Sequence, residues 1–376
     1  MGKRKLLFLL AISIAVFALS QCKKDQVVYR DDNGTVQPPP GPQPTPYSLS
    51  IPPGFPAPYI PADNPLTVEG VELGRFLFYD KRLSKDLSMS CGSCHMQQVA
   101  FSDREVRSFG IHGQQTRRHS MPLFNLAWQE NFFWDGRVIS LEEQALQPVT
   151  DQIELDNDWP TVVARLEADS VYPEMFEKAF GSGPITKENA ARAIAQFERS
   201  IVSANSEFDQ VVRLKNKADF DDPGASRAWQ FFNSETGGDC FHCHGSAETA
   251  FLMGAFGRDL QFLNNGLDTP EDQLDDKGRE EVTGNINDRA KFKVASVRNS
   301  FFSAPFMHDG SIPDLDSLVE FYNFGGHITP TIDPNMKAAG VGRNWTPQQK
   351  QDLIKLLEAF TDYEFLQKPE YANPFE

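Results

Sequence analysis

Two copies of one pattern, Cys-x-x-Cys-His, constrain this chain more than any other feature of its sequence. They span residues 91–95 and 240–244 and use four of the five cysteines. In such a motif each cysteine sulfur can form a thioether to a haem vinyl group, and the adjoining histidine binds the iron. The chain is therefore predicted to carry two covalently attached c-type haems, one on Cys91, Cys94 and His95, the other on Cys240, Cys243 and His244.

Other chemistry is compatible with a Cys-x-x-Cys pair. Such a pair is also typical of a redox disulfide or of half a zinc site, and the two pairs could share one zinc ion through four thiolates. Neither alternative explains why a histidine follows both pairs. The strand–helix context of a thioredoxin-like motif is also absent. We therefore favour haem at both motifs.

The N-terminus has the pattern of an export signal. In residues 1–22, positive charges at 3–5 precede an apolar run at 6–19 that is short for a bilayer span. This segment ends at Cys22, the fifth cysteine, in a sequence that resembles a bacterial lipoprotein processing site. We expect a periplasmic protein tethered through lipid on Cys22. Gln21 departs from the usual Gly, Ala or Ser, so ordinary cleavage with a free thiol is the alternative.

The remaining chain divides into a tether and two parts of similar size. Residues 23–60 contain a proline-rich stretch at 38–46, which favours extended conformations and suits a spacer; a disordered terminus would have a similar sequence. We predict an N-terminal haem domain at 61–204 and a C-terminal haem domain at 205–376.

The periodic segments of these two parts are almost all helical. A helix is expected after Thr186, another after Thr346 with Gln349 completing a capping box, and a third from Ser140 to before Pro148, with Glu143 as its capping partner. Long alternation of apolar and polar residues is missing. We predict an all-α fold of two packed cytochrome c-like domains with long ordered loops.

The formal net charge of -16 bears on possible partners. It argues against nucleic acid binding and suits docking to a basic protein, such as a small electron carrier. An acidic solvated surface is the simpler explanation of the same charge.

The residues around the haem motifs resemble those of bacterial di-haem cytochrome c peroxidases and the related MauG proteins. The likeness covers roughly residues 65–365 in consistent order, and its strongest parts are Ala100–Asp103, Asn131–Arg137, Leu141–Pro148 and Ala304–Gly310. The resemblance implies that peroxide reacts at the N-terminal haem and that the C-terminal haem passes electrons to it.

The resemblance also implies roles for four residues near the first haem. Glu154, twenty residues after Trp134, is expected to move protons during peroxide cleavage, and Gln144 and Pro148 to line the peroxide pocket. Trp134 is expected to relay electrons between the haems. Without the resemblance, Glu154 would be read as part of a solvated acidic loop and Trp134 as a core aromatic residue.

Two further family features match less closely. His112 resembles a loop histidine that blocks the first iron in the resting enzyme and leaves on activation, although an exposed loop histidine is equally compatible. His119 replaces an asparagine that helps to hold calcium between the domains, and imidazole is a poor calcium ligand. The family's other calcium positions are the carbonyls of Ser303 and Pro305, so one calcium ion remains an expectation.

The sixth ligand of the second iron distinguishes the subfamilies. Peroxidases have methionine fourteen residues after the histidine of the His-Asp-Gly motif, MauG proteins have tyrosine, and here the position is Tyr322. A phenolate lowers the reduction potential of a haem, whereas methionine raises it. If Tyr322 only packs in a helix, the ligand is Met307, Met336 or a different group.

The leading hypothesis is therefore an exported peroxidase that reduces hydrogen peroxide with electrons from a small cytochrome c or copper protein. A MauG-like enzyme that oxidises residues of a protein substrate is the alternative, and a di-haem electron carrier without peroxide chemistry is a third possibility. The hypothesis includes no membrane contact beyond the lipid on Cys22, and a homodimer is compatible with it.

Overall fold

The computed structural model describes residues 29–30, 36–37, 43–215, 217–245, 262–270, 272 and 275–376. The chain divides into a short unit, 1–41, and a compact unit, 42–376. In the short unit, β1 (Tyr29–Arg30) pairs antiparallel with β2 (Val36–Gln37). The predicted signal peptide and Cys22 lie outside the described residues, as does the proline-rich stretch up to residue 42.

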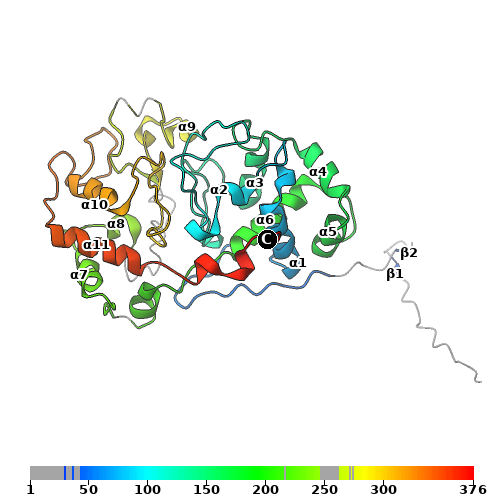
Figure 1. Cartoon of the computed structure of the whole chain (residues 1–376), viewed down its shortest axis with the longest axis horizontal. Coiled ribbons are helices and arrows are strands. Elements are labelled where there is room, and N and C mark those ends of the chain that lie inside the picture. The colour runs from blue at the N-terminus through cyan, green and yellow to red at the C-terminus, as the bar shows by residue number, and fades with distance from the viewer. Residues whose placement is uncertain are drawn as a thin grey trace, which may run out of the picture. The chain divides into compact units, whose positions relative to one another are not determined.

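The compact unit is built mainly from α-helices joined by long loops (Figure 1). Strands contribute little, since β3 (Phe262–Leu263) and β4 (Phe292–Lys293) form one short antiparallel ladder. The fold is thus helix-rich, as predicted, although the β1–β2 and β3–β4 ladders make it less than strictly all-α. The helices are α1 (Val68–Tyr79), α2 (Cys91–Cys94), α3 (Leu141–Thr150), α4 (Trp159–Glu167), α5 (Tyr172–Phe180), α6 (Lys187–Ser200), α7 (Pro223–Phe232), α8 (Phe241–His244), α9 (Glu280–Thr283), α10 (Leu315–Phe324) and α11 (Pro347–Ala359), with a π-helical turn at Asp209–Arg213.

Two helix starts follow the capping signals in the sequence. The Thr186 side chain accepts a hydrogen bond from the Asn189 N–H at the start of α6. At the start of α11, Thr346 and Gln349 form the reciprocal capping box. Both predictions are confirmed, because local side-chain acceptors satisfy N–H groups that the helix itself cannot.

Helix α3 starts as predicted and ends later. Ser140 accepts a hydrogen bond from the Glu143 N–H, but the helix continues through Pro148 to Thr150. The prediction that it ends before Pro148 is wrong. The missing N–H of Pro148 deprives only the carbonyl of Gln144 of a helical bond, and the final turn is closed by the Asp151 N–H, which donates to the Gln147 carbonyl at 3.0 Å.

The first hydrophobic core is centred on α1 and α6. Leu73 and Phe78 of α1 and Phe197 of α6 are fully buried there. The two helices approach closely at Gly74, where an added Cβ would lie 1.9 Å from the Ala193 carbonyl oxygen. A glycine is therefore required at this crossing.

A second core lies among α7, α11 and the π-helical turn. It contains Phe208, Trp229, Leu356 and Phe360. The two clusters lie in the two halves of the sequence, but the residues at the C-terminus do not follow this division: Phe365, Leu366 and Tyr371 pack into the first core. The domain boundary at 204/205 stays a prediction.

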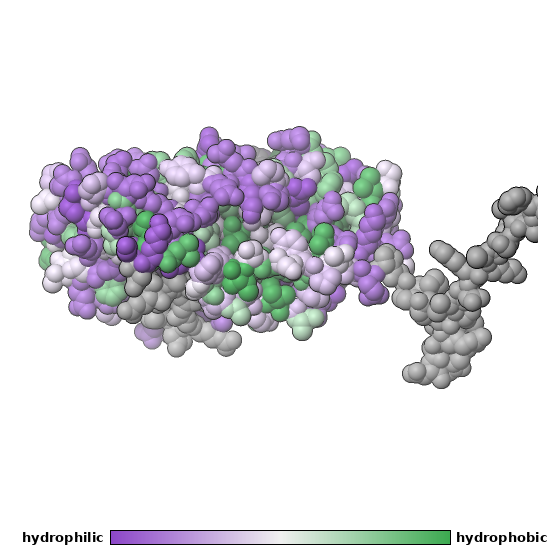
Figure 2. All heavy atoms as spheres, turned by 90° about the horizontal axis from the view of Figure 1, so that it is seen from below, coloured by the Kyte–Doolittle hydropathy of each residue, from purple (hydrophilic) through white to green (hydrophobic). Residues whose placement is uncertain are grey.

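No helix among the described residues is both long and apolar enough to cross a membrane. The face of the molecule shown in Figure 2 is mainly hydrophilic, with apolar side chains scattered between the polar ones.

Candidate functional site

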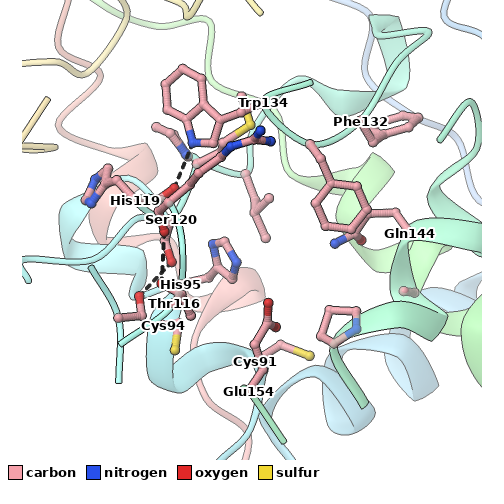
Figure 3. A pocket seen from close by; sticks show the side chains of 18 of the residues that line it. Cys91, Cys94, His95, Thr116, His119, Ser120, Phe132, Trp134, Gln144 and Glu154 are labelled. Atoms are coloured by element: carbon pink, nitrogen blue, oxygen red, sulfur yellow. Dashed lines mark hydrogen bonds between the residues drawn. The ribbon is translucent and has the colours of Figure 1, made fainter. Parts of the chain in front are cut away.

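The first Cys-x-x-Cys-His motif opens onto a cavity of about 500 Å³. The cavity combines side chains from α2, from α3 and from the loops between residues 108 and 155 (Figure 3). Residues named from the sequence come together here, because the wall includes Cys91, Cys94, His95, Trp134, Gln144, Pro148 and Glu154.

The position and tautomer of His95 are fixed by the loop that follows it. Its Nδ1 lies 2.9 Å from the carbonyl oxygen of Phe101. A carbonyl only accepts, so Nδ1 carries the hydrogen and Nε2 keeps a lone pair for a metal. Burial lowers the pKa of His95, which favours the neutral ring that binds iron.

The cysteines suit thioether attachment in this geometry. All four motif cysteines are free, and burial raises the pKa of Cys94 and of Cys243 to about 12, so the thiols are neutral. The two pairs line different cavities, which argues against one zinc ion shared by four thiolates. Paired thiols, an oriented imidazole and a large cavity fit a c-type haem.

Glu154 brings a carboxyl group into the first cavity. Its backbone is held by a hydrogen bond from the Ile111 N–H to the Glu154 carbonyl at 3.0 Å. Burial and, to a smaller extent, the charge of Asp151 raise the pKa of Glu154 to about 7, while Arg137 opposes the shift. A carboxyl group that can hold or release a proton near neutral pH is suited to acid–base work.

Gln144 and Pro148 are one turn apart on α3 and so present their side chains on the same face of the helix. This face lines the cavity that also contains Glu154. The continuation of α3 through Pro148 therefore places both residues in the site.

The second motif opens onto a smaller cavity of about 210 Å³. His244, at the end of α8, has its Nδ1 3.0 Å from the Ala295 carbonyl oxygen, so its Nε2 is also available to a metal. The cavity wall includes Cys240 and Cys243 from the same motif and Tyr322 from α10.

The predicted sixth ligands of the second iron share this cavity. Tyr322, Met307 and Met336 all line it. Burial raises the pKa of Tyr322, while a hydrogen bond from the Asn265 side chain opposes the shift. Asn265 also donates to the Met307 sulfur at 3.4 Å. Tyr322 thus lines the cavity of the second motif, and its ligation of the iron stays a prediction.

Trp134 lies in the wall between the two cavities and lines both. Its indole N–H donates to the His119 carbonyl at 2.7 Å, and its own carbonyl accepts from the Lys293 N–H at 2.7 Å. The indole ring centre is 6.5 Å from that of His308. An oxidisable ring fixed in this wall is suited to electron relay.

His112 lies apart from the first cavity. Its side chain is 52% exposed, and its Nε2 is 2.9 Å from an Asp156 carboxylate oxygen. It is not among the residues that line the cavity. Its role as a removable iron ligand would require the loop to move and stays a prediction.

The calcium expectation concerns the carbonyls of Ser303 and Pro305 and the position of His119. The His119 ring is hydrogen bonded, with Nε2 3.2 Å from the Ser102 hydroxyl and Nδ1 3.1 Å from the Glu105 carbonyl. Ser303 and Pro305 are buried, and in the described part of the chain no cluster of three or more His, Cys, Asp or Glu residues could hold a metal. Calcium binding stays a prediction.

Two cavity-lining residues were missed from the sequence. Glu198 of α6 is only 3% exposed and carries an oxygen without a hydrogen-bond partner among the described residues. It stands four residues after Ile194, so the helical period already placed it on the buried face. Lys293 lines both cavities, and no sequence signal distinguishes it from Lys291.

Comparison with known proteins shows that this chain is similar to di-haem enzymes. The family model described as di-haem cytochrome c peroxidase matches residues 68–217. The methylamine utilization protein MauG of Methylorubrum extorquens is 33% identical over 299 residues, which cover 79% of this chain and 80% of that protein. The cytochrome c551 peroxidase of Nitrosomonas europaea is 33% identical over 263 residues, which cover 69% of this chain and 75% of that protein.

A solved structure is also similar. The crystal structure of a MauG-like protein associated with microbial copper homeostasis has a TM-score of 0.77 and 32% sequence identity to this chain. The match covers 88% of this chain and all of that one.

Proposed function

Because the chain belongs to the di-haem cytochrome c peroxidase family, an oxidoreductase family with two haem c groups, we propose that it reduces hydrogen peroxide in the first cavity. Each peroxide takes up two electrons and two protons and gives two water molecules. The observation that best supports this proposal is the carboxyl group of Glu154 in the cavity of Cys91, Cys94 and His95.

A haem held by Cys91, Cys94 and His95 would supply the redox chemistry for cleavage of the oxygen–oxygen bond. The protein must move a proton from one peroxide oxygen to the other, and Glu154 can do so because its raised pKa, about 7, lets it both accept and donate near neutral pH. Gln144 and Pro148 shape the same cavity and limit where peroxide can lie.

Electrons reach the first cavity through the wall that separates it from the second. Trp134 belongs to both cavities, so it is the proposed relay. A small cytochrome c or copper protein is the proposed donor, and the net charge of -16 favours a basic one. We also propose that the protein is exported to the periplasm and is held at the membrane by lipid on Cys22.

The direct test is Glu154→Gln. The amide cannot exchange a proton near neutral pH, so peroxide turnover with a reduced cytochrome c should fall roughly 10²–10⁴-fold, the usual contribution of a positioned acid–base group. Haem content and the spectra of the resting protein should be retained. Glu143→Gln, an exposed glutamate at the start of α3, is the matched control. Equal turnover in Glu154→Gln and wild type would contradict the proposal.

A second candidate function is favoured by Tyr322. Tyrosine at this position matches the MauG pattern, and the chain is 33% identical to MauG of Methylorubrum extorquens. In this version the electrons come from side chains of a protein substrate. Peroxide consumption that oxidises a protein without any reduced carrier would favour it, whereas strict dependence on a reduced carrier would favour the peroxidase.

A further inference from the structure

We propose that Lys293 is a positioning residue that holds a propionate carboxylate of the first haem and supplies a positive charge that raises this haem's reduction potential. The inference rests on haem in the first cavity and is independent of peroxide chemistry. It concerns a residue of the C-terminal half of the chain acting on the haem of the N-terminal half.

The amine of Lys293 lies on the side of the first cavity. Its Nζ donates to the side-chain oxygen of Gln129 and to the carbonyl of Asn131, and it lies 5.4 Å from the centre of the Phe132 ring. Gln129 and Phe132 line the first cavity and not the second. Lys293 thus lines both cavities, whereas the contacts of its Nζ place the charged group on the side of the first cavity.

The surroundings of this amine lack a balancing charge. Within the described residues, no carboxylate lies within ion-pair distance of Nζ, and burial lowers the pKa of Lys293 to about 7. An ammonium group that has only neutral oxygens and an aromatic face around it is costly to bury. A carboxylate that enters the cavity would keep the lysine charged and remove most of this cost.

Haem brings such carboxylates, since its two propionates are its only anionic side groups. The other basic side chains of the first cavity already have protein partners. Each of the three arginines that line it is paired with a carboxylate: Arg117 with Glu281 at 2.6 Å, Arg118 with Asp135 at 2.6 Å and Arg137 with Asp135 at 3.3 Å. Among the described residues that line this cavity, Lys293 is therefore the cation whose charge remains for the haem.

A propionate held here would also connect the haem to the electron relay. The Lys293 N–H donates to the Trp134 carbonyl at 2.7 Å, so the strand that carries the lysine also positions the indole. A fixed positive charge beside a haem favours the reduced iron, which carries one less positive charge. Loss of the charge should therefore lower the potential of the first haem.

The test uses Lys293→Met in the full-length, haem-loaded protein. Redox titration followed by absorption should give a lower midpoint potential for the first haem and an unchanged one for the second. The resonance Raman propionate-bending band of the first haem should shift in the same variant. Lys293→Arg, which keeps the charge, should restore the wild-type potential.

Lys291→Met is the matched control, because Lys291 stands two residues earlier, lies outside both cavities and pairs with Asp288 at 3.3 Å. It removes the same charge from the protein and should leave both potentials unchanged. Wild-type potentials and an unshifted Raman band in Lys293→Met would overturn the proposal, as would an equal shift in Lys291→Met. If Lys293→Met does not load haem, Lys293→Arg decides: a wild-type potential supports the proposal and a lowered one overturns it.

Discussion

Tyr322 is the single residue on which the properties of the second haem are expected to depend most. It shares a cavity with His244, and a phenolate on iron stabilises the ferric state. Tyr322→Phe should therefore change the absorption spectrum of the second haem and raise its reduction potential. Tyr363→Phe, at a half-exposed tyrosine outside this cavity, should change neither. A wild-type spectrum and potential in Tyr322→Phe would exclude Tyr322 and leave Met307, Met336 or a different group as the ligand.

Glu198 should make the stability of the protein depend on pH. Burial raises its pKa to about 8, and Glu142 adds to the shift while Arg199 opposes it. Because the folded-state pKa lies above the unfolded value of about 4.3, the folded protein binds the extra proton. The stability that this proton provides is complete below the unfolded pKa and is lost as pH rises towards the folded pKa.

Glu198→Gln should remove this dependence. The variant should be close to wild type in stability at about pH 4 and more stable by about 3–5 kcal/mol at about pH 8, because each unit between the unfolded and the folded pKa is worth about 1.4 kcal/mol. Melting temperatures of the haem-loaded proteins across this range would measure the difference. Glu188→Gln, at an exposed glutamate of the same helix, should follow wild type. A constant difference between Glu198→Gln and wild type at all pH values would contradict the prediction.

The sequence predicts individual site residues where they belong to a short motif or a fixed spacing. The first haem motif and the spacing of Glu154 from Trp134 led to residues that share one cavity. It did not lead to Lys293, because nothing along the chain shows which of Lys291 and Lys293 faces inward. His112 lies outside the cavity since its loop is bonded to the backbone of Glu154 and its ring to Asp156, contacts that depend on tertiary structure.

Among the elements, α1 and α6 form the core beside the first cavity, and they cross at Gly74 so closely that no side chain fits there. Gly74→Ala should destabilise the protein by about 1–3 kcal/mol or more, because the added methyl would meet the backbone of Ala193, which cannot move aside as a side chain can. Alanine is otherwise the better helix former. Thermal or urea unfolding would measure the loss. Gly183→Ala, which enters open space, is the control and should be nearly neutral.

Helix starts were easier to predict than helix ends. The side chains of Thr186 and Thr346 accept hydrogen bonds from N–H groups three residues later, so the starts of α6 and α11 can be recognised from the local sequence. The end of α3 depends instead on whether packing offsets the bond lost at Pro148, and that packing comes from residues distant in sequence. The helix therefore runs one turn further than its sequence suggested.

For the whole molecule, the two halves are joined by a segment that the sequence did not reveal. Residues 365–371 form only short 3₁₀ turns, so they lack the periodic pattern that marks a packing helix. They cross from the end of the second half to the first core, where Phe365 and Tyr371 are buried (Figure 1). Two haem motifs predict two haem sites, but the spacing of motifs cannot show which half the C-terminus joins.

This C-terminal segment should hold the first haem site in place. The Tyr371 hydroxyl donates to the Ser200 carbonyl at 3.0 Å, and Gln97, close to His95, donates to the Phe365 and Lys368 carbonyls at 3.1 Å and 2.9 Å. Removal of residues 365–376 should cost at least the burial of one large apolar side chain, about 2–5 kcal/mol. The loss should fall on the first half, because the second core contains none of these residues.

Limited proteolysis with mass spectrometry would locate this effect. Cleavage in the truncated protein should become faster within residues 61–204 and stay at the wild-type rate within 275–360, while the melting temperature falls. Removal of only residues 373–376, which keeps Tyr371, should leave the pattern close to wild type. Equal acceleration in both halves would mean that the two cores unfold as one cooperative unit, and no acceleration would mean that the segment contributes little to the first core.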